Sequence, residues 1–163
     1  MTIKALATFL VLAMPPLALA RLGETERQLN QRFGAPIERT KETTAAQGKT
    51  VEFGDRLVFH QGDWTIESVV IDGRCAWESY KKLGDWTETQ FLLVLTTNAQ
   101  GARWTDFSEL ETRDTLRDWR REDGGTAHWQ TGQAMVVVHP AYQRAKERAE
   151  ARAKAEAARL PKI

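Results

Sequence analysis

The sequence predicts an α+β protein: two tandem units, each a short helix followed by an antiparallel β-meander, and then a C-terminal helix. Thr25-Glu26-Arg27-Gln28 and Thr87-Glu88-Thr89-Gln90 both carry the Thr-x-x-Gln pattern of a capping box, in which side chains satisfy the first free N–H groups of a helix. After each of them, apolar and polar residues alternate and turn residues recur at short intervals, which is typical of antiparallel strands. The shared order of elements predicts an internal repeat.

The first unit is assigned to residues 21–84. Its helix is predicted over about residues 26–33, because Gly34 and Pro36 prevent continuation. The polar stretch 38–48 contains no apolar residue larger than Ala and is expected to be a loop. Asp72-Gly73 is the strongest hairpin signal in the chain. Four strands are expected in this unit, near residues 51–53, 57–59, 64–71 and 74–80.

The second unit is assigned to residues 85–139. Its helix is predicted over about residues 88–98, and a polar crossing follows at 108–115. The turns Asp123-Gly124-Gly125 and Gly132-Gln133 then divide the remaining chain into strands. These strands are expected at residues 116–121, 126–131 and 134–139.

The C-terminal stretch 140–163 is rich in Ala, Arg, Glu and Lys and is predicted to be a basic helix, with seven Lys and Arg against three Glu. Small or apolar residues recur along it at spacings of three and four, giving a narrow seam. Two interpretations stay open: a solvated helical arm, or a docking helix whose small side chains allow close approach to a partner. The seam of the docking interpretation consists of Tyr142, Ala145, Ala149 and Ala153.

Residues 1–20 have the pattern of a signal peptide: Lys4, an apolar run, and Ala18-Leu19-Ala20 as a small-x-small cleavage signal. We expect cleavage after Ala20 and a periplasmic or secreted product that does not span the membrane. Arg21 stands where a bacterial lipoprotein would carry its acylated Cys. The whole chain of 163 residues has a net charge of only +1, which together with export argues against nucleic acid as a partner.

The sequence predicts no enzyme, no metal and no cofactor. His60, His128, His139 and Cys75 lack the spacing of a zinc site, and no Ser lies in a Gly-x-Ser-x-Gly elbow. Cys75 is the only Cys, so no disulfide forms within the chain; it is expected to be a buried residue or, as the alternative, a link between chains. A small hydrolase remains as the third functional hypothesis.

The six tryptophans are the richest feature of the sequence that the motifs above do not explain. Most of them are expected in the core, but Trp119 and Trp129, together with Arg117 and Arg121, could form an aromatic and basic surface on a solvent-facing sheet face. Such a surface suits protein binding, and as the alternative it suits stacking on glycan or cell-wall sugars. The opposing interpretation is a solvated strand whose arginines pair with neighbouring acidic residues.

The stretch from Leu22 to Pro36 combines Gly-x-Thr, a short helix and aromatic-Gly-x-Pro. This pattern resembles the opening of small envelope proteins built from helix-plus-meander modules: the small outer-membrane-assembly lipoproteins and the β-lactamase-inhibitor-protein-like fold. The chain departs from them in having one helix per sheet and no lipid-carrying Cys. The resemblance implies a non-catalytic protein that binds another envelope or secreted protein.

Overall fold

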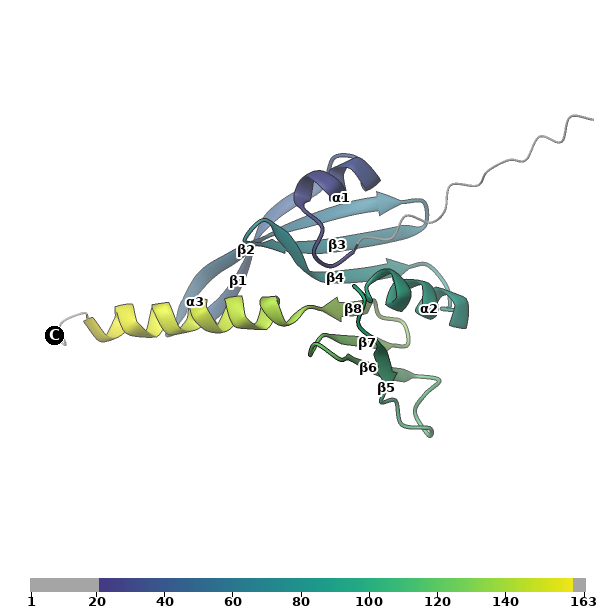
Figure 1. Cartoon of the computed structure of the whole chain (residues 1–163). Helices are drawn as coiled ribbons and strands as arrows, with labels where there is room; N and C mark the ends of the chain where they lie inside the picture. The colour runs from purple at the N-terminus through teal and green to yellow at the C-terminus, as the bar shows by residue number, and fades with distance from the viewer. Residues whose placement is uncertain (1–20, 160–163) are drawn as a thin grey trace, which may run out of the picture.

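The computed structural model describes residues 21–159. It has three helices and one antiparallel sheet of eight strands, so the predicted α+β class is confirmed (Figure 1). The expected signal peptide, residues 1–20, lies outside the described residues, as do the last four residues of the predicted C-terminal helix region.

The first unit consists of α1 (Glu26–Phe33) and the meander β1 (Glu38–Ala46), β2 (Lys49–Gln61), β3 (Trp64–Ile71) and β4 (Arg74–Lys82). The predicted capping box is present: the Thr25 hydroxyl accepts from the N–H of Gln28, whose side chain accepts from the N–H of Thr25. The β3–β4 turn is made by Asp72 and Gly73, both with positive φ (51° and 77°), as the hairpin signal predicted.

Two strand predictions in this unit are wrong. Residues 38–46 form the edge strand β1 rather than a loop, with Glu42 and Thr44 buried under a helix and the intervening residues exposed. The expected strands 51–53 and 57–59 are parts of one strand, β2, which runs through Gly54. A Cβ at position 54 would lie 3.0 Å from the carbonyl oxygen of Val70, so this glycine permits close strand packing and is not a turn.

The second unit consists of α2 (Glu88–Thr97), β5 (Trp104–Asp106), β6 (Leu116–Arg121), β7 (Thr126–Gln130) and β8 (Met135–Val138). The three strands predicted here are confirmed, and β5 is an additional short edge strand. The strand order is β1-β2-β3-β4-β8-β7-β6-β5. The last strands of the two meanders, β4 and β8, therefore pair with each other and join both units in a single sheet.

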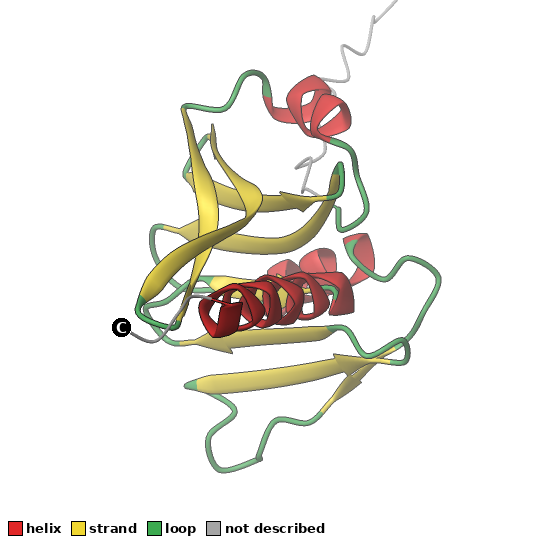
Figure 2. Cartoon of the chain, turned by 90° about the vertical axis from the view of Figure 1, so that its left-hand side faces the viewer, coloured by secondary structure: helices red, strands yellow, loops and turns green. Residues whose placement is uncertain are grey.

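The helices lie on opposite faces of this sheet (Figure 2). α1 and α2 cover one face, where the main core contains Leu29 of α1, Phe91 of α2 and inward residues of both meanders. α3 (Pro140–Arg159) covers the other face and packs mainly on β1 to β4. On the face of β6 and β7 opposite α2, alternate residues of β7 are exposed, so residues 21–159 leave this face partly open.

α3 confirms the predicted C-terminal helix. Its small-residue seam packs on the sheet. Ala145 and Ala149 are buried against the sheet, while Tyr142 and Ala153 are half-buried. The Tyr142 hydroxyl donates to Glu42 of β1 at 2.5 Å. The expected docking seam is thus occupied by the chain's own first meander rather than left for a partner. Among the described helices, none combines the length and the apolar character needed to cross a membrane.

Candidate functional site

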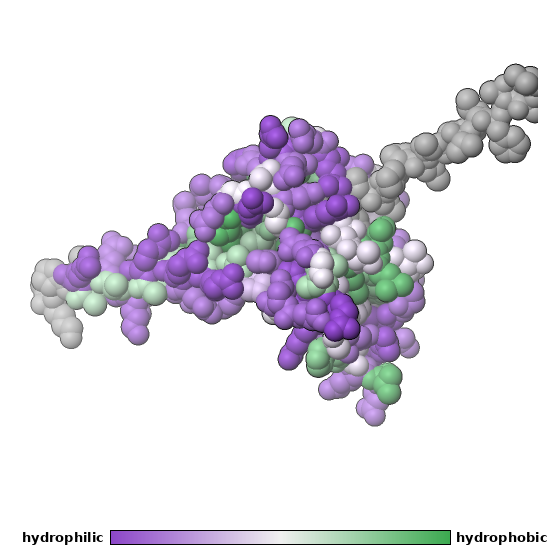
Figure 3. All heavy atoms as spheres, viewed as in Figure 1, coloured by the Kyte–Doolittle hydropathy of each residue, from purple (hydrophilic) through white to green (hydrophobic). Residues whose placement is uncertain are grey.

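Among the described helices, α2 is the one with large apolar side chains exposed on its outer side. The run Phe91-Leu92-Leu93-Val94-Leu95 covers more than one helical turn, so these five side chains cannot all face the sheet. Phe91, Val94 and Leu95 are buried, whereas Leu92 is 61% and Leu93 37% exposed. Figure 3 shows apolar side chains at the surface around α2. The outer side of α2 therefore carries two exposed leucines among the polar residues Glu88, Thr89 and Thr96.

A groove of about 450 Å³ opens beside this helix, between α2 and the strands β5 and β6. Its apolar lining includes Phe91, Leu92 and Leu95 of α2, with Trp104 and Trp119 from the strands. The indole N–H of Trp104 donates to the carbonyl oxygen of Leu95 at 2.8 Å, which fixes this ring against the helix. We call this feature the α2 groove.

Charged side chains around the α2 groove are paired with one another. Arg117 binds Glu88 at 2.6 Å, Arg113 binds Asp106 at 2.5 Å, and Arg103 binds Glu122 at 2.8 Å. Each of these three carboxyl groups has a lowered pKa. For Glu88 the main cause is the hydrogen bond from Arg117. The groove therefore presents apolar surface within a rim whose charges are neutralised in pairs.

Two of the residues predicted for a binding surface, Arg117 and Trp119, do line the α2 groove, but the predicted exposed surface is wrong. Trp119 is 6%, Trp129 7%, Arg117 9% and Arg121 2% exposed. These side chains point to the α2 face of the sheet, where the Phe91 ring contacts Trp119, Trp129 and the Arg117 guanidinium. The solvent-facing residues are the alternate ones, such as Arg120 and His128, so the prediction chose the wrong face by one residue.

Burial of the two arginines is compensated by specific partners. The Arg121 guanidinium forms two hydrogen bonds to the Asp123 carboxylate, at 2.7 and 2.8 Å, and a third to the carbonyl oxygen of Asn98. Arg117 donates from Nε to the carbonyl oxygen of Arg113 and stacks on the Phe91 ring. These residues therefore serve to anchor the second meander and α2.

A second polar cluster lies at the junction of the two meanders, in the core beneath α1 and α2. The fully buried carboxyl group of Glu78 accepts hydrogen bonds from the Tyr80 hydroxyl and from the Cys75 thiol. The Asn98 amide donates to Tyr80, and its oxygen accepts from the N–H of Leu22. This network thus connects β4 with the end of α2 and with the segment before α1.

Burial sets the protonation of this cluster. It raises the pKa of Glu78 to about 7, and the hydrogen bonds from Tyr80 and Cys75 only partly oppose this effect. The pKa of the Cys75 thiol lies well above its ordinary value, mainly because it is buried and secondly because of the nearby Glu78. Such a thiol is protonated and a poor nucleophile.

The three histidines have different partners. His60 contacts Thr65, His128 contacts Asp118 at 2.8 Å, and His139 lies 3.9 Å from Asp123. Within residues 21–159, no three His, Cys, Asp or Glu side chains are grouped so that they could hold a metal ion.

Sequence reasoning missed both the α2 groove and the Glu78 cluster. The groove had a readable signal, because five successive apolar residues in a short helix must leave some of them outside. Glu78 stands inside a strand between Trp77 and Ser79, and Asn98, which donates to its partner Tyr80, comes from a different element. Comparisons with protein-family models, with curated proteins and with solved structures give no significant match for this chain.

Proposed function

We propose that the protein is a secreted or periplasmic, non-catalytic binding module that docks a partner protein at the α2 groove. The observation that carries this proposal is the exposure of Leu92 beside an apolar groove of about 450 Å³. Apolar area of this kind is costly to leave in water, and rimmed apolar patches are typical of protein interaction sites.

The rim indicates the chemistry of the partner. Arg117, Arg113 and Arg103 already have carboxylate partners, so an incoming charge would have to displace an existing ion pair. An uncharged apolar segment can enter without leaving any charge unpaired. The proposed occupant is therefore a protein segment that inserts one or two apolar side chains between α2 and Trp104.

The alternatives are less well supported. Glycan binding was expected to use exposed tryptophans, but Trp64, Trp119 and Trp129 are buried and the remaining three are only half-buried. A hydrolase that used Cys75 as its nucleophile is disfavoured, because this thiol is buried and its pKa is raised. The proposed location rests on the signal-peptide pattern of residues 1–20.

Photo-crosslinking tests the proposed site. A photoreactive amino acid replaces Leu92 in one variant and Gln130 in another, and each variant is illuminated in the producing cell. Gln130 is the control because it is also exposed but lies on β7 outside the α2 groove. We expect a defined protein adduct from position 92, absent from position 130 and abolished when Trp104→Ala is added.

Three results would contradict the proposal. Equal adducts from both positions would indicate unspecific proximity, and no adduct from position 92 would indicate that the groove has no protein partner. An adduct of twice the chain mass would identify a second copy as the occupant in place of a different protein.

A further inference from the structure

α3 carries a stripe of arginines on one flank. Arg144, Arg148 and Arg152 follow one another at intervals of four residues, so they share one side of the helix, and all three are exposed. The positions between them on this flank are alanines, including Ala151 and Ala155. The opposite flank instead mixes both signs, with Lys146 and Lys154 among glutamates. We call Arg144, Arg148 and Arg152 the arginine stripe.

The stripe is largely unpaired. Arg148 lies 3.4 Å from Asp72, and both side chains are mostly exposed, so this ion pair is weak. Neither Arg144 nor Arg152 forms an ion pair with another described residue. Like charges four residues apart destabilise a helix slightly, so the stripe has a small cost to the isolated chain.

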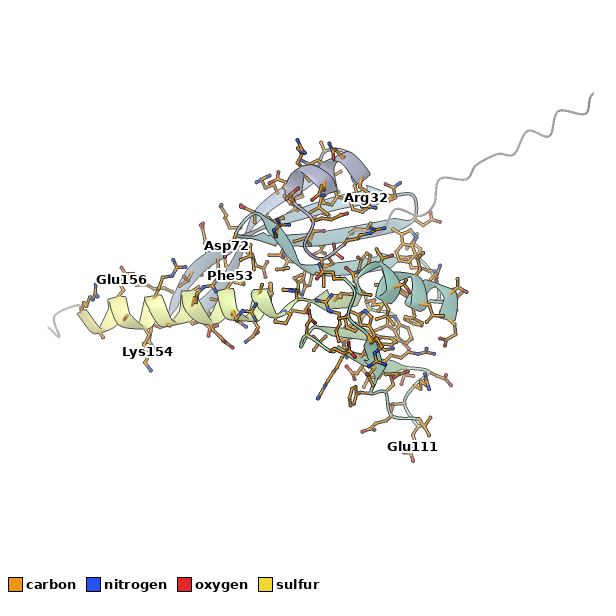
Figure 4. The ribbon with its side chains drawn as sticks, in the orientation of Figure 1. Arg32, Phe53, Asp72, Glu111, Lys154 and Glu156 are labelled. Atoms are coloured by element: carbon orange, nitrogen blue, oxygen red, sulfur yellow. The ribbon has the colours of Figure 1, made fainter. Side chains whose placement is uncertain are left out.

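The stripe borders an apolar hollow. A cavity of about 360 Å³ lies between α3 and the strands β2 and β3, with Phe53 and Ile71 in its lining and Arg148 and Arg152 at its edge. Figure 4 shows Phe53 and Asp72 on one side of α3 and Lys154 on the other. Phe53 is half-buried, with its ring packed edge-on against Tyr142.

We propose that the arginine stripe and the Phe53 hollow bind an acidic protein segment that inserts an apolar side chain. Unpaired guanidinium groups are complementary to carboxylates and bind them in two-point contacts, and the hollow gives the apolar side chain a place beside them. This site lies on the α3 face of the sheet, opposite the α2 groove, and it differs from that groove in its unpaired charge.

An acidic peptide fits better than an anionic lipid surface. The apolar part of the site, at Phe53 and Ile71, is a hollow between α3 and the strands, which a single peptide side chain can enter and a flat layer of headgroups cannot. Asp72 at the rim is already paired with Arg148, so the carboxylates of the peptide have Arg144 and Arg152 as their unpaired partners.

Peptide binding to chain 21–163 tests the proposal. The probe is a fluorescein-labelled peptide with glutamates on both sides of one phenylalanine, and its anisotropy is measured during titration. Arg148→Glu/Arg152→Glu is compared with Lys146→Glu/Lys154→Glu, a double variant with the same charge change on the other flank of α3. We expect about tenfold or greater loss of affinity in the first variant and less than about threefold loss in the second.

Further probes separate the alternatives. Phe53→Ala, or a peptide with Ala in place of its phenylalanine, is expected to weaken binding about tenfold because the hollow is then unused. Far-UV circular dichroism confirms that each variant is folded. Equal losses in the two double variants would overturn the proposal in favour of unspecific charge attraction. Absence of peptide binding would overturn it too, and sedimentation with phosphatidylglycerol vesicles in that case would assign the stripe to a membrane surface.

Discussion

The two halves of the sheet have the same order of elements but very different cover. Strands β1 to β4 have 9, 13, 8 and 9 residues, whereas β5 to β8 have 3, 6, 5 and 4. The first half lies between α1 on one face and α3 on the other, and β3 contains no exposed residue. Among the described helices, α2 is the main cover of the second half, and every second residue of β7 is exposed.

The two halves are therefore expected to differ in stability and in the surface that they leave exposed. A strand buried on both faces derives stability from both, so the first half is expected to be the more stable part. The second half has one packed face, which depends on the aromatic contacts made by α2. Both proposed sites lie on the part of a covering helix that does not pack on the sheet. These parts are the outer side of α2 and the charged flank of α3.

The largest expected loss of stability comes from removing the Phe91 side chain, which lies at the centre of the aromatic contacts in the second half. Phe91 stacks on Trp86 and contacts Trp119 and Trp129, so Phe91→Ala should cost about 3–5 kcal/mol of unfolding free energy. Urea denaturation measures this loss. Hydrogen exchange should show weakened protection in β6 and β7 with β3 less affected, whereas uniform loss across the sheet would show that the two halves unfold as one unit. Leu92→Ala is the exposed control.

The second prediction concerns the pH dependence of stability, which tests the junction between the two halves. The pKa of Glu78 is raised from its ordinary value of 4.5 to about 7, so the folded state holds this proton more tightly than the unfolded state. The resulting stabilisation is complete below about pH 4.5 and is lost as the pH rises through 7, a change of about 3 kcal/mol. Glu78→Gln should remove this part of the pH dependence and be the more stable protein at pH 8.

Denaturation series of both proteins between pH 4 and 8 measure this difference. Glu52→Gln, at an exposed position of β2, is the control and should leave the pH profile unchanged. Parallel profiles for the wild type and Glu78→Gln would show that the carboxyl group titrates in the folded state as it does in the unfolded state.

The third prediction concerns α3, the helix that covers the second face of the first half. Ala149 is fully buried between α3 and the sheet, so Ala149→Leu should overpack this contact and cost about 1–3 kcal/mol. Ala155→Leu adds the same side chain to an exposed position of the same helix and should change stability by less than about 0.5 kcal/mol. Thermal unfolding of both variants measures the difference. Equal stability of the two variants would mean that α3 is not firmly docked in solution.

Much of the fold was predictable because its signals are local. The capping boxes at Thr25 and Thr87 and the turn at Asp72-Gly73 act through neighbouring residues, so the sequence alone locates them. β1 was missed because its inward residues, Glu42 and Thr44, are polar and are buried by Tyr142 and Glu150 of a helix about 100 residues later. No local pattern reports such contacts.

The candidate site was less predictable, since it depends on which face of a strand turns inward. In Leu116–Arg121 both alternating sets contain charged residues, and either could face the solvent. Phe91 determines which set faces inward, because its ring contacts Trp119, Trp129 and the Arg117 guanidinium. This contact brings α2 onto strands that follow it by about 20 to 40 residues in the chain, beyond the reach of periodicity.

The smallest expected loss of stability is that of His128→Ala. Its comparison with the adjacent residue Trp129 tests which face of β7 turns inward. His128 is exposed and bonded to Asp118, with both side chains 48% exposed, so His128→Ala should change stability by less than about 0.5 kcal/mol. Trp129, the next residue, is buried against Phe91, and Trp129→Ala should cost about 3–5 kcal/mol. Urea denaturation of the two variants at one pH gives the ratio directly. Similar losses would mean that both faces of β7 are covered in solution.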